Sequence, residues 1–160
     1  MSVKFKVAVI FVKDVDASRA FYEGLLGQKV TMDHGENVEF EGGLSIWDVN
    51  HAYEMVYQRA PESDAPLGRE NLELYFESSD LDAIWQTLSD ARVDVVHPMR
   101  EQPWGQRVFR VHDPDGHVVE VGEPISATIL RYHAQGMDAA AVAERTSMPL
   151  EIVEQVIGEA

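Results

Sequence analysis

A four-residue motif that occurs twice, each time after a strand-like segment, is the strongest constraint on the fold. It reads DVDA at Asp14–Ala17 and DLDA at Asp80–Ala83, 66 residues later. In both copies the aspartates suit the N-terminus of a helix, where their side chains accept hydrogen bonds from free backbone N–H groups. Similar elements at a fixed interval indicate a duplicated structural unit. The sequence therefore predicts an α+β fold built from two tandem β-α-β-β-β modules.

Apolar runs, caps and turn residues give the elements of the first module. A run rich in Val, Ile and Phe predicts a buried strand, and Gly27 should end the helix that follows. The expected elements are a strand at Val3–Val12, a helix at Ala17–Leu26, and strands at Lys29–Met32, Val38–Phe40 and Leu44–Trp47. Prolines, glycine and charges over Asn50–Glu70 indicate a connector.

The second module repeats this order. A strand is predicted at Asn71–Phe76, followed by a helix that Asp80 caps and whose apolar positions recur at helical spacing. A hairpin of Arg107–His112 and Val118–Gly122 should enclose the turn sequence DPDG at Asp113–Gly116. We therefore expect a first module over residues 1–55, a connector over 56–70, a second module over 71–124 and a helical tail over 125–160.

The tail should contain three helices, at Ser126–Gln135, at Asp138–Thr146 and from Pro149 onward. The spacing of its last two helices is similar to that of a helix-turn-helix unit. A DNA-binding unit needs cations on its second helix, but Leu150–Ala160 has three glutamates and neither lysine nor arginine. We expect its apolar stripe to dock on the protein body or on a dimer partner.

Charge and cysteine content exclude several functions. Thirteen basic residues against 28 acidic ones give a net charge of −15, which disfavours nucleic acid and anionic membranes as partners. The absence of cysteine removes disulfides, thiolate metal sites and cysteine nucleophiles. The early apolar run Val7–Val12 is too short for a signal sequence or a membrane span, so we expect a cytoplasmic protein.

Two segments resemble the vicinal oxygen chelate superfamily, which includes glyoxalase I, bleomycin-resistance proteins, fosfomycin-resistance enzymes and extradiol dioxygenases. They are Val12–Gly27, with its Ser18, Phe21-Tyr22 and Leu25-Leu26-Gly27, and Asp113–Glu120, which reads DPDGHVVE. The resemblance covers residues 3 to 123. It implies two modules whose curved sheets enclose a U-shaped pocket, commonly in a homodimer.

The resemblance also implies a divalent metal, such as Mg, Mn, Fe or Zn, held by His, Glu or Gln side chains on facing strands. Glu120 matches one ligand position, and Glu73 stands where histidine is more common. The equivalent first-module position is Val7, which cannot coordinate a metal and argues against glyoxalase activity. Two carboxylates suit a hard ion such as Mg²⁺ or Mn²⁺, with His112 or His97 as the nearest candidate third ligand.

Strand alternation predicts which side chains line the pocket, because successive residues face opposite sides of a sheet. On each predicted sheet, the face turned away from the helix should line the pocket. Together these faces carry apolar side chains, aromatic rings and charged groups, a mixture that suits a small ligand with an apolar body and a polar end. The expected ligand-binding residues are Val7, Val9, Trp47, Tyr75, Trp104, Arg110 and His112, and Glu73 and Glu120 lie on the same face as Arg110. Two of these residues have a structural alternative. Trp104 is equally consistent with a side chain that covers the edge of the core. Arg110 is also consistent with a structural ion pair to Glu73 or Glu120 that leaves neither charge buried alone.

Two functions fit these residues. The first is a protein that binds a small molecule in a sheet-lined pocket and whose metal site is degenerate. The second is a divalent-metal-dependent lyase, isomerase or dioxygenase-type enzyme, in which Glu120, Glu73 and Arg110 are the catalytic residues. The two functions differ in whether the polar half of the pocket is an ion pair or a metal site. A regulator acting through the tail is a third, weaker alternative.

Overall fold

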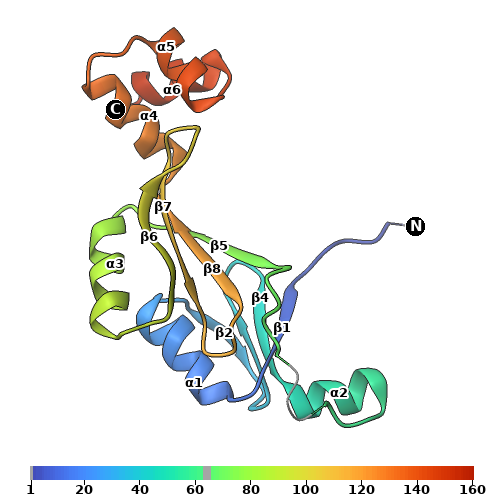
Figure 1. The fold of residues 1–160 in the computed structure, drawn as a ribbon. Helices are drawn as coiled ribbons and strands as arrows, with labels where there is room; N and C mark the ends of the chain where they lie inside the picture. The colour runs from blue at the N-terminus through green and yellow to red at the C-terminus, as the bar shows by residue number, and fades with distance from the viewer. Residues whose placement is uncertain (1, 63–65) are drawn as a thin grey trace. The chain divides into compact units, whose positions relative to one another are not determined.

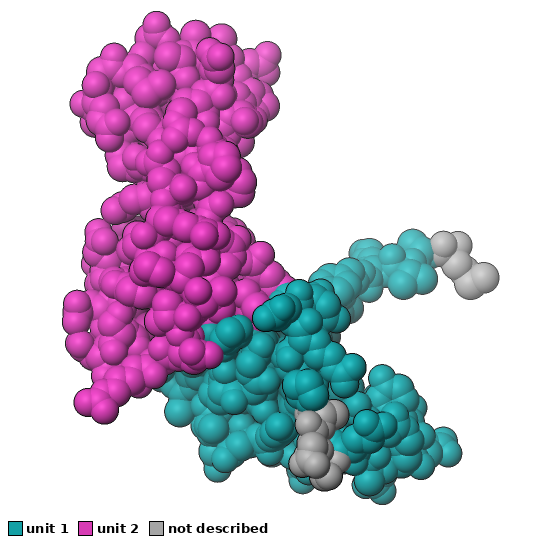
Figure 2. Space-filling model, in the orientation of Figure 1, with its two compact units in different colours: residues 1–72, 112–117 teal, residues 73–111, 118–160 magenta. Residues whose placement is uncertain are grey.

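The computed structural model describes residues 2–62 and 66–160, which divide into two compact units (Figures 1 and 2). Unit 1 comprises residues 1–72 and 112–117, and unit 2 comprises residues 73–111 and 118–160. Each unit contains one four-stranded sheet, and helices follow the second sheet at the C-terminus. The predicted α+β class with two sheet modules is confirmed. No helix in the described part of the chain is long and apolar enough to cross a membrane.

Unit 1 has a sheet of strand order β1-β4-β3-β2, in which β1 runs parallel to β4. Its elements are β1 (Ala8–Val12), α1 (Val15–Arg19), the π-helix η1 (Ala20–Leu25), β2 (Val30–Asp33), β3 (Asn37–Phe40), β4 (Leu44–Asp48) and α2 (Val49–Tyr57). Alternate residues Ile10, Val12, Val38, Phe40 and Ile46 are buried, as expected for a sheet with one covered face.

Unit 2 repeats the arrangement with strand order β5-β8-β7-β6 and β5 parallel to β8. Its elements are β5 (Glu73–Glu77), α3 (Leu81–Asp90), β6 (Val95–Glu101), β7 (Arg107–His112), β8 (Val118–Gly122), α4 (Ile125–Ala134), α5 (Ala139–Thr146) and α6 (Leu150–Gly158). The covered face carries four buried side chains, Phe109, Val111, Val119 and Val121. The ring of Phe109 packs edge-on against Trp85 of α3, with 5.1 Å between the ring centroids.

The duplicated motif has the same role in both modules. The Asp14 carboxylate accepts a hydrogen bond from Ala17 N at 3.0 Å, and the Asp80 carboxylate accepts one from Ala83 N at 3.1 Å. Each bond satisfies a backbone donor that the first turn of a helix leaves free. The predicted caps are therefore confirmed in both modules.

The first strand is shorter than predicted. Only Ala8–Val12 belongs to the sheet, whereas residues 2–7 lie outside any strand, with Val3 and Phe5 exposed. The reason is the length of the partner strand, because β4 begins at Leu44, opposite Ala8. The chain before β4 turns at Gly43, so the residues before Ala8 have no strand beside them.

Two further predictions in unit 1 were wrong in part. The expected connector at Asn50–Glu70 begins with helix α2, because Asp48 accepts a hydrogen bond from His51 N and caps it. The predicted single helix at Ala17–Leu26 is α1 followed by η1, which has wider turns, as the bond from Leu26 N to Phe21 O shows. In unit 2, the module pattern requires a strand between α3 and β7, but no local pattern in the sequence marks β6 (Val95–Glu101).

The DPDG turn is fastened to the first helical segment by a buried aspartate of unit 1. The Asp113 carboxylate, which is fully buried, accepts hydrogen bonds from Tyr22 Oη at 2.7 Å and from His117 N at 2.8 Å. It also pairs with the His117 ring. Burial raises the pKa of Tyr22, with the charge of Asp113 acting in the same direction, so the phenol remains a donor to the carboxylate. Residues far apart in sequence are thereby fixed in one unit.

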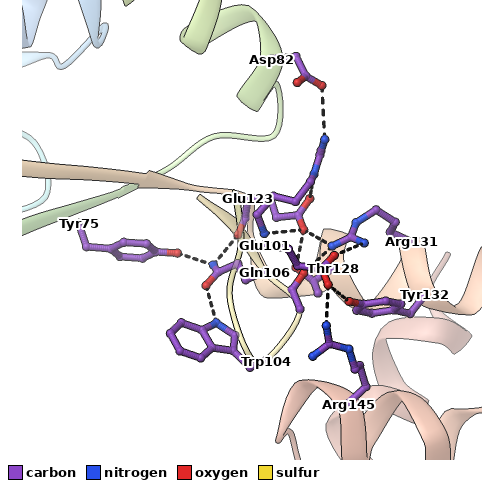
Figure 3. Close-up of polar contacts among 12 residues, drawn as sticks. Tyr75, Asp82, Glu101, Trp104, Gln106, Glu123, Thr128, Arg131, Tyr132 and Arg145 are labelled. Atoms are coloured by element: carbon purple, nitrogen blue, oxygen red, sulfur yellow. Dashed lines mark hydrogen bonds and ion pairs between the residues drawn. The ribbon is translucent and has the colours of Figure 1, made fainter. Parts of the chain in front are cut away.

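The three predicted tail helices are present as α4, α5 and α6, and they share a small apolar core of Ile129, Tyr132, Val142 and Val153. Charged side chains join this tail to the β6–β7 hairpin (Figure 3). Glu101 accepts hydrogen bonds from Tyr132 Oη at 2.8 Å and from the guanidinium groups of Arg131 at 3.3 Å and Arg145 at 2.5 Å. The hairpin and the tail therefore form one structural part of unit 2.

The contact between Gly105 and Tyr132 gives a test of this docking. Gly105 has φ +89°, and a Cβ there would lie 2.4 Å from the Tyr132 ring. Gly136 has a similar φ of +94° but no neighbour within 4 Å of a Cβ. We expect Gly105→Ala to lower the free energy of unfolding by about 1–3 kcal/mol more than Gly136→Ala, because only the former adds steric overlap to backbone strain. Urea denaturation measures both, and equal losses would contradict the docking contact.

Candidate functional site

The open face of the second sheet brings together a cluster of polar side chains from four adjacent strands. Tyr75 of β5 lies opposite Glu120 of β8, and Arg110 of β7 lies opposite His97 of β6. Glu73 precedes Tyr75 by two residues and so shares its face. The opposite face is the apolar layer that packs under α3. The alternation expected from the sequence is therefore confirmed for this sheet.

Arg110 is the centre of the cluster. Its Nε donates to Glu73 Oε1 at 2.5 Å, and its Nη2 forms an ion pair with Glu120 Oε2. Its Nη1 lies 3.0 Å from Nε2 of His97. His97 Nδ1 lies 2.8 Å from the Pro98 carbonyl oxygen, which can only accept, so Nδ1 carries the proton and Nε2 accepts from Arg110. Each nitrogen of the guanidinium thus faces a partner, two as hydrogen bonds and Nη2 as an ion pair.

Glu120 is the buried carboxylate of the cluster, with a side chain 8% exposed, whereas the Glu73 side chain is 42% exposed. Burial raises the pKa of Glu120 to about 7; Arg110 opposes this shift and Glu73 adds to it. Oε2 of Glu120 lies against Arg110 as an ion pair, yet it accepts no hydrogen bond of normal geometry. The negative charge of Glu120 is therefore only partly stabilised by its surroundings, which agrees with its raised pKa.

Glu73 and Glu120, the predicted metal ligands, do not fit a metal site in this arrangement. Both carboxylates face Arg110, and the one nearby imidazole nitrogen accepts from the same guanidinium. Within residues 2–62 and 66–160, no group of three or more His, Cys, Asp or Glu side chains is placed to hold a metal ion. His97, a candidate third ligand in the sequence, instead accepts from Arg110 through Nε2.

Two partly exposed aromatic rings, Tyr75 and Trp104, flank the polar cluster and are held by one glutamine (Figure 3). Gln106 Oε1 accepts from Trp104 Nε1 at 3.0 Å, and Gln106 Nε2 donates to Tyr75 Oη at 2.8 Å. The Tyr75 ring lies against Gly122, where a Cβ would come within 3.1 Å of it. Burial raises the pKa of Tyr75 to about 12, with its hydrogen bond to Glu77 acting in the same direction. The rings can therefore stack against a ligand with their polar atoms already bonded.

Sequence reasoning missed Gln106 as the residue that positions both rings. Its signal was only its place between Gly105 and Arg107 in a turn of the hairpin. The role of His97 was also missed, because β6 was not identified and its register against Arg110 was therefore unknown. Both omissions come from contacts between strands that no local pattern contains.

The other predicted ligand-binding residues belong to unit 1. Val9 lies opposite Ser45 and Phe11 opposite Trp47, so this sheet also has the expected shared face, and Val7 precedes β1. Trp47 donates from Nε1 to His51 Nδ1 at 3.2 Å, and its ring contacts Phe11 edge-on. His112 ends β7 and belongs to the unit 1 segment 112–117.

Comparison with known proteins identifies the fold. A model of the family described as glyoxalase-like domain matches residues 5–126. The chain belongs to the glyoxalase-like domain family. Its membership of the vicinal oxygen chelate superfamily, which the sequence resemblance implied, is thereby confirmed. The family match ends at residue 126, so α5 and α6 lie beyond it.

Several solved structures share this glyoxalase-like fold. A protein of unknown function from Agrobacterium tumefaciens str. C58 is 40% identical with a TM-score of 0.73, over 78% of this chain and 96% of that one. A lactoylglutathione lyase from Agrobacterium tumefaciens is 23% identical with a TM-score of 0.59, over 78% and 96%. TioX from Micromonospora sp. ML1 is 19% identical with a TM-score of 0.55, over 76% and 98%. At these lower identities the likeness shows the fold alone. A comparison with curated proteins finds no match.

The raised pKa of Glu120 predicts a pH dependence of stability. Because this pKa of about 7 lies above the ordinary value of 4.5, the carboxyl group stabilises the fold fully below pH 4.5 and loses that contribution as the pH rises through about 7. The free energy of unfolding of the wild type should therefore fall relative to that of Glu120→Gln between about pH 5 and about pH 8. Urea denaturation across this range measures the difference. Exposed Glu154→Gln is the control, and a constant difference for Glu120→Gln would contradict the assignment.

Proposed function

We propose that this chain binds a small ring-bearing organic molecule on the open face of its second sheet, without a resident metal ion. The observation that carries the proposal is the Arg110 guanidinium, which lies between Glu73 and Glu120. These are the two positions that the superfamily resemblance assigned to a metal. A guanidinium there already supplies the positive charge that a cation would bring.

A metal would have to displace this arginine before binding. Arg110 uses all three of its nitrogens within the cluster, and its side chain is only 20% exposed. Its expulsion would break its ion pairs with Glu73 and Glu120 and leave His97 Nε2 without its donor, and both losses oppose metal binding. This supports a binding protein over the alternative of a divalent-metal-dependent lyase, isomerase or dioxygenase.

The charges of the site favour a ligand with a cationic or neutral polar end. Arg110 faces two carboxylates, so the cluster has no spare positive charge for an anion. The partly protonated Glu120 can accept from a ligand donor or donate to a ligand oxygen. Tyr75 and Trp104 offer ring surface for an aromatic or alkyl body. Val7, Val9, Trp47 and His112 of unit 1 stay sequence-based predictions of ligand-binding residues.

The metal question is tested by thermal melting of wild type and Arg110→Ala with and without millimolar Mn²⁺. We expect little shift for the wild type, and a rise in melting temperature for Arg110→Ala, because removing the guanidinium frees two carboxylates for the ion. Without metal, Arg110→Ala should lose about 1–3 kcal/mol of stability, whereas exposed Arg92→Ala should lose little. A large wild-type shift with stoichiometric metal, abolished by Glu120→Ala, would instead support the metal-dependent enzyme.

Ligand class is tested with matched pairs of aromatic amines and aromatic carboxylates, such as phenethylamine and 3-phenylpropionate, by calorimetric titration. The amine should bind more tightly, because the site has two carboxylates and one guanidinium. Tyr75→Ala should weaken binding about threefold to tenfold through the lost ring contact. The exposed Tyr57→Ala, on α2, is the matched control. Preferential binding of the carboxylate, or an unchanged affinity in Tyr75→Ala, would contradict the proposed site.

A further inference from the structure

The loop that carries Trp104 is held on both sides by arginines of the helical tail. Arg131 of α4 donates through Nη2 to the carbonyl oxygen of Gly105 at 2.6 Å, and Arg145 of α5 donates through Nη1 to the carbonyl oxygen of Pro103. These two carbonyls belong to the residues immediately after and before Trp104. The tail therefore fixes the backbone on both sides of a ring that the proposed site uses.

Each of these two arginines is itself held in place by a carboxylate. Nη2 of Arg131 also donates to Glu123 Oε1 at 2.7 Å, and Nη2 of Arg145 donates to Glu101 Oε1 at 2.5 Å. Both guanidinium groups lie over the Tyr132 ring, with 4.7 and 5.3 Å between their central carbons and the ring centroid. A planar guanidinium can bind a carboxylate and a carbonyl together, because its N–H groups point in fixed directions. The loop is therefore joined to the tail by contacts of defined geometry.

The side chain of Trp104 is linked to the tail by a second route, through Gln106 and Glu123 (Figure 3). The indole Nε1 can only donate, so Gln106 turns Oε1 toward it, and Gln106 Nε2 donates to the Glu123 carbonyl oxygen at 2.6 Å. Glu123 lies between β8 and α4, and its buried carboxylate accepts from Thr128 Oγ1 of α4 at 2.9 Å. The indole is therefore fixed by the same tail as the loop that carries it.

These contacts matter for binding because Trp104 is only partly covered by other side chains. The residue is 39% exposed, so hydrophobic packing alone does not hold the ring in one orientation. A mobile side chain must be ordered when it stacks on a ligand, and the entropy lost in ordering it opposes binding. Contacts that already hold the ring remove this loss from the binding step, so they should raise the affinity for a ring-bearing ligand.

We propose that the helical tail positions Trp104 for ligand binding, with Arg131 and Arg145 as the positioning residues. Both arginines lie beyond the family match, which ends at residue 126, so this role is assigned to a part of the chain outside the matched domain. The effect on ligand affinity rests on the proposed function. The placement of the ring does not, because the contacts that hold it lie entirely within unit 2.

The placement of the ring is measured by fluorine NMR of the full chain labelled with 5-fluorotryptophan, in which Trp104→Phe identifies the Trp104 resonance. Arg131→Lys/Arg145→Lys keeps both charges but loses the planar fork that binds a carbonyl and a carboxylate together. We expect this variant to shift or broaden the Trp104 resonance. Arg59→Lys is the matched control, because Arg59 also donates to a backbone carbonyl but belongs to unit 1. An unchanged Trp104 resonance in the double variant, or an equal change in the control, would overturn the proposal.

Ligand affinity gives the second test, with phenethylamine as the probe in calorimetric titration. Arg131→Lys/Arg145→Lys should weaken binding about threefold to tenfold, as the loss of a ring contact does. In a Trp104→Ala background the same pair should change the affinity less than about twofold, because the ring on which it acts is absent. Urea denaturation checks that each variant is folded, and Arg145→Lys alone replaces the pair where it is not. Equal losses in both backgrounds would indicate a general structural effect and would overturn the proposal.

The two measurements separate this proposal from the proposed function. If phenethylamine does not bind the wild type, the proposed ligand class is wrong, and the fluorine spectra still decide whether the tail positions the ring. If phenethylamine binds and Tyr75→Ala weakens its binding, but the arginine pair acts equally with and without Trp104, the ligand site is supported and the role of the tail is overturned.

Discussion

The placement of one arginine between two carboxylates determines what the open face of the second sheet can do. Arg110 forms ion pairs with both Glu73 and Glu120 and fixes the tautomer of His97. An isolated buried carboxylate would be strongly unfavourable, and the guanidinium fork satisfies several acceptors at once. One guanidinium therefore offsets only one of the two carboxylate charges at this face, and burial favours the protonated form of Glu120. In the function that we propose, a ligand would therefore meet ring surface, together with one glutamate of raised pKa.

A comparison of two buried glutamates of unit 2 shows why their pKa values shift in opposite directions. Burial alone would raise the pKa of Glu123, but hydrogen bonds from Arg131 and Arg107, with a further one from Thr128, lower it below its ordinary value. Glu123 accepts four such bonds, at 2.7 to 3.1 Å (Figure 3). Glu120 has an ion pair but no bond of normal geometry to Oε2, and its pKa rises. Glu123 therefore holds β7, β8 and α4 together, whereas Glu120 is the carboxylate that we propose to contact the ligand.

The sequence predicted the parts of the fold that depend on local chemistry. The duplicated aspartates predicted both helix caps, and alternation predicted the faces of Glu73, Arg110 and Glu120, because capping and strand period need only neighbouring residues. It did not predict where β1 begins, because this depends on the length of β4. Nor could it show that His97 lies opposite Arg110, since β6 is irregular and its register depends on the adjacent strand.

The helical tail lies almost entirely outside the family match. It is nevertheless hydrogen-bonded to the residues that hold the aromatic rings. The Glu123 carbonyl accepts from Gln106 Nε2 at 2.6 Å, and Gln106 in turn binds Tyr75 and Trp104. The carboxylate of the same Glu123 binds Arg131 of α4. One residue thus joins the tail to the ring-bearing end of the sheet. A glyoxalase-like sheet supports many functions, so additions that position its side chains are where this chain can differ from its relatives.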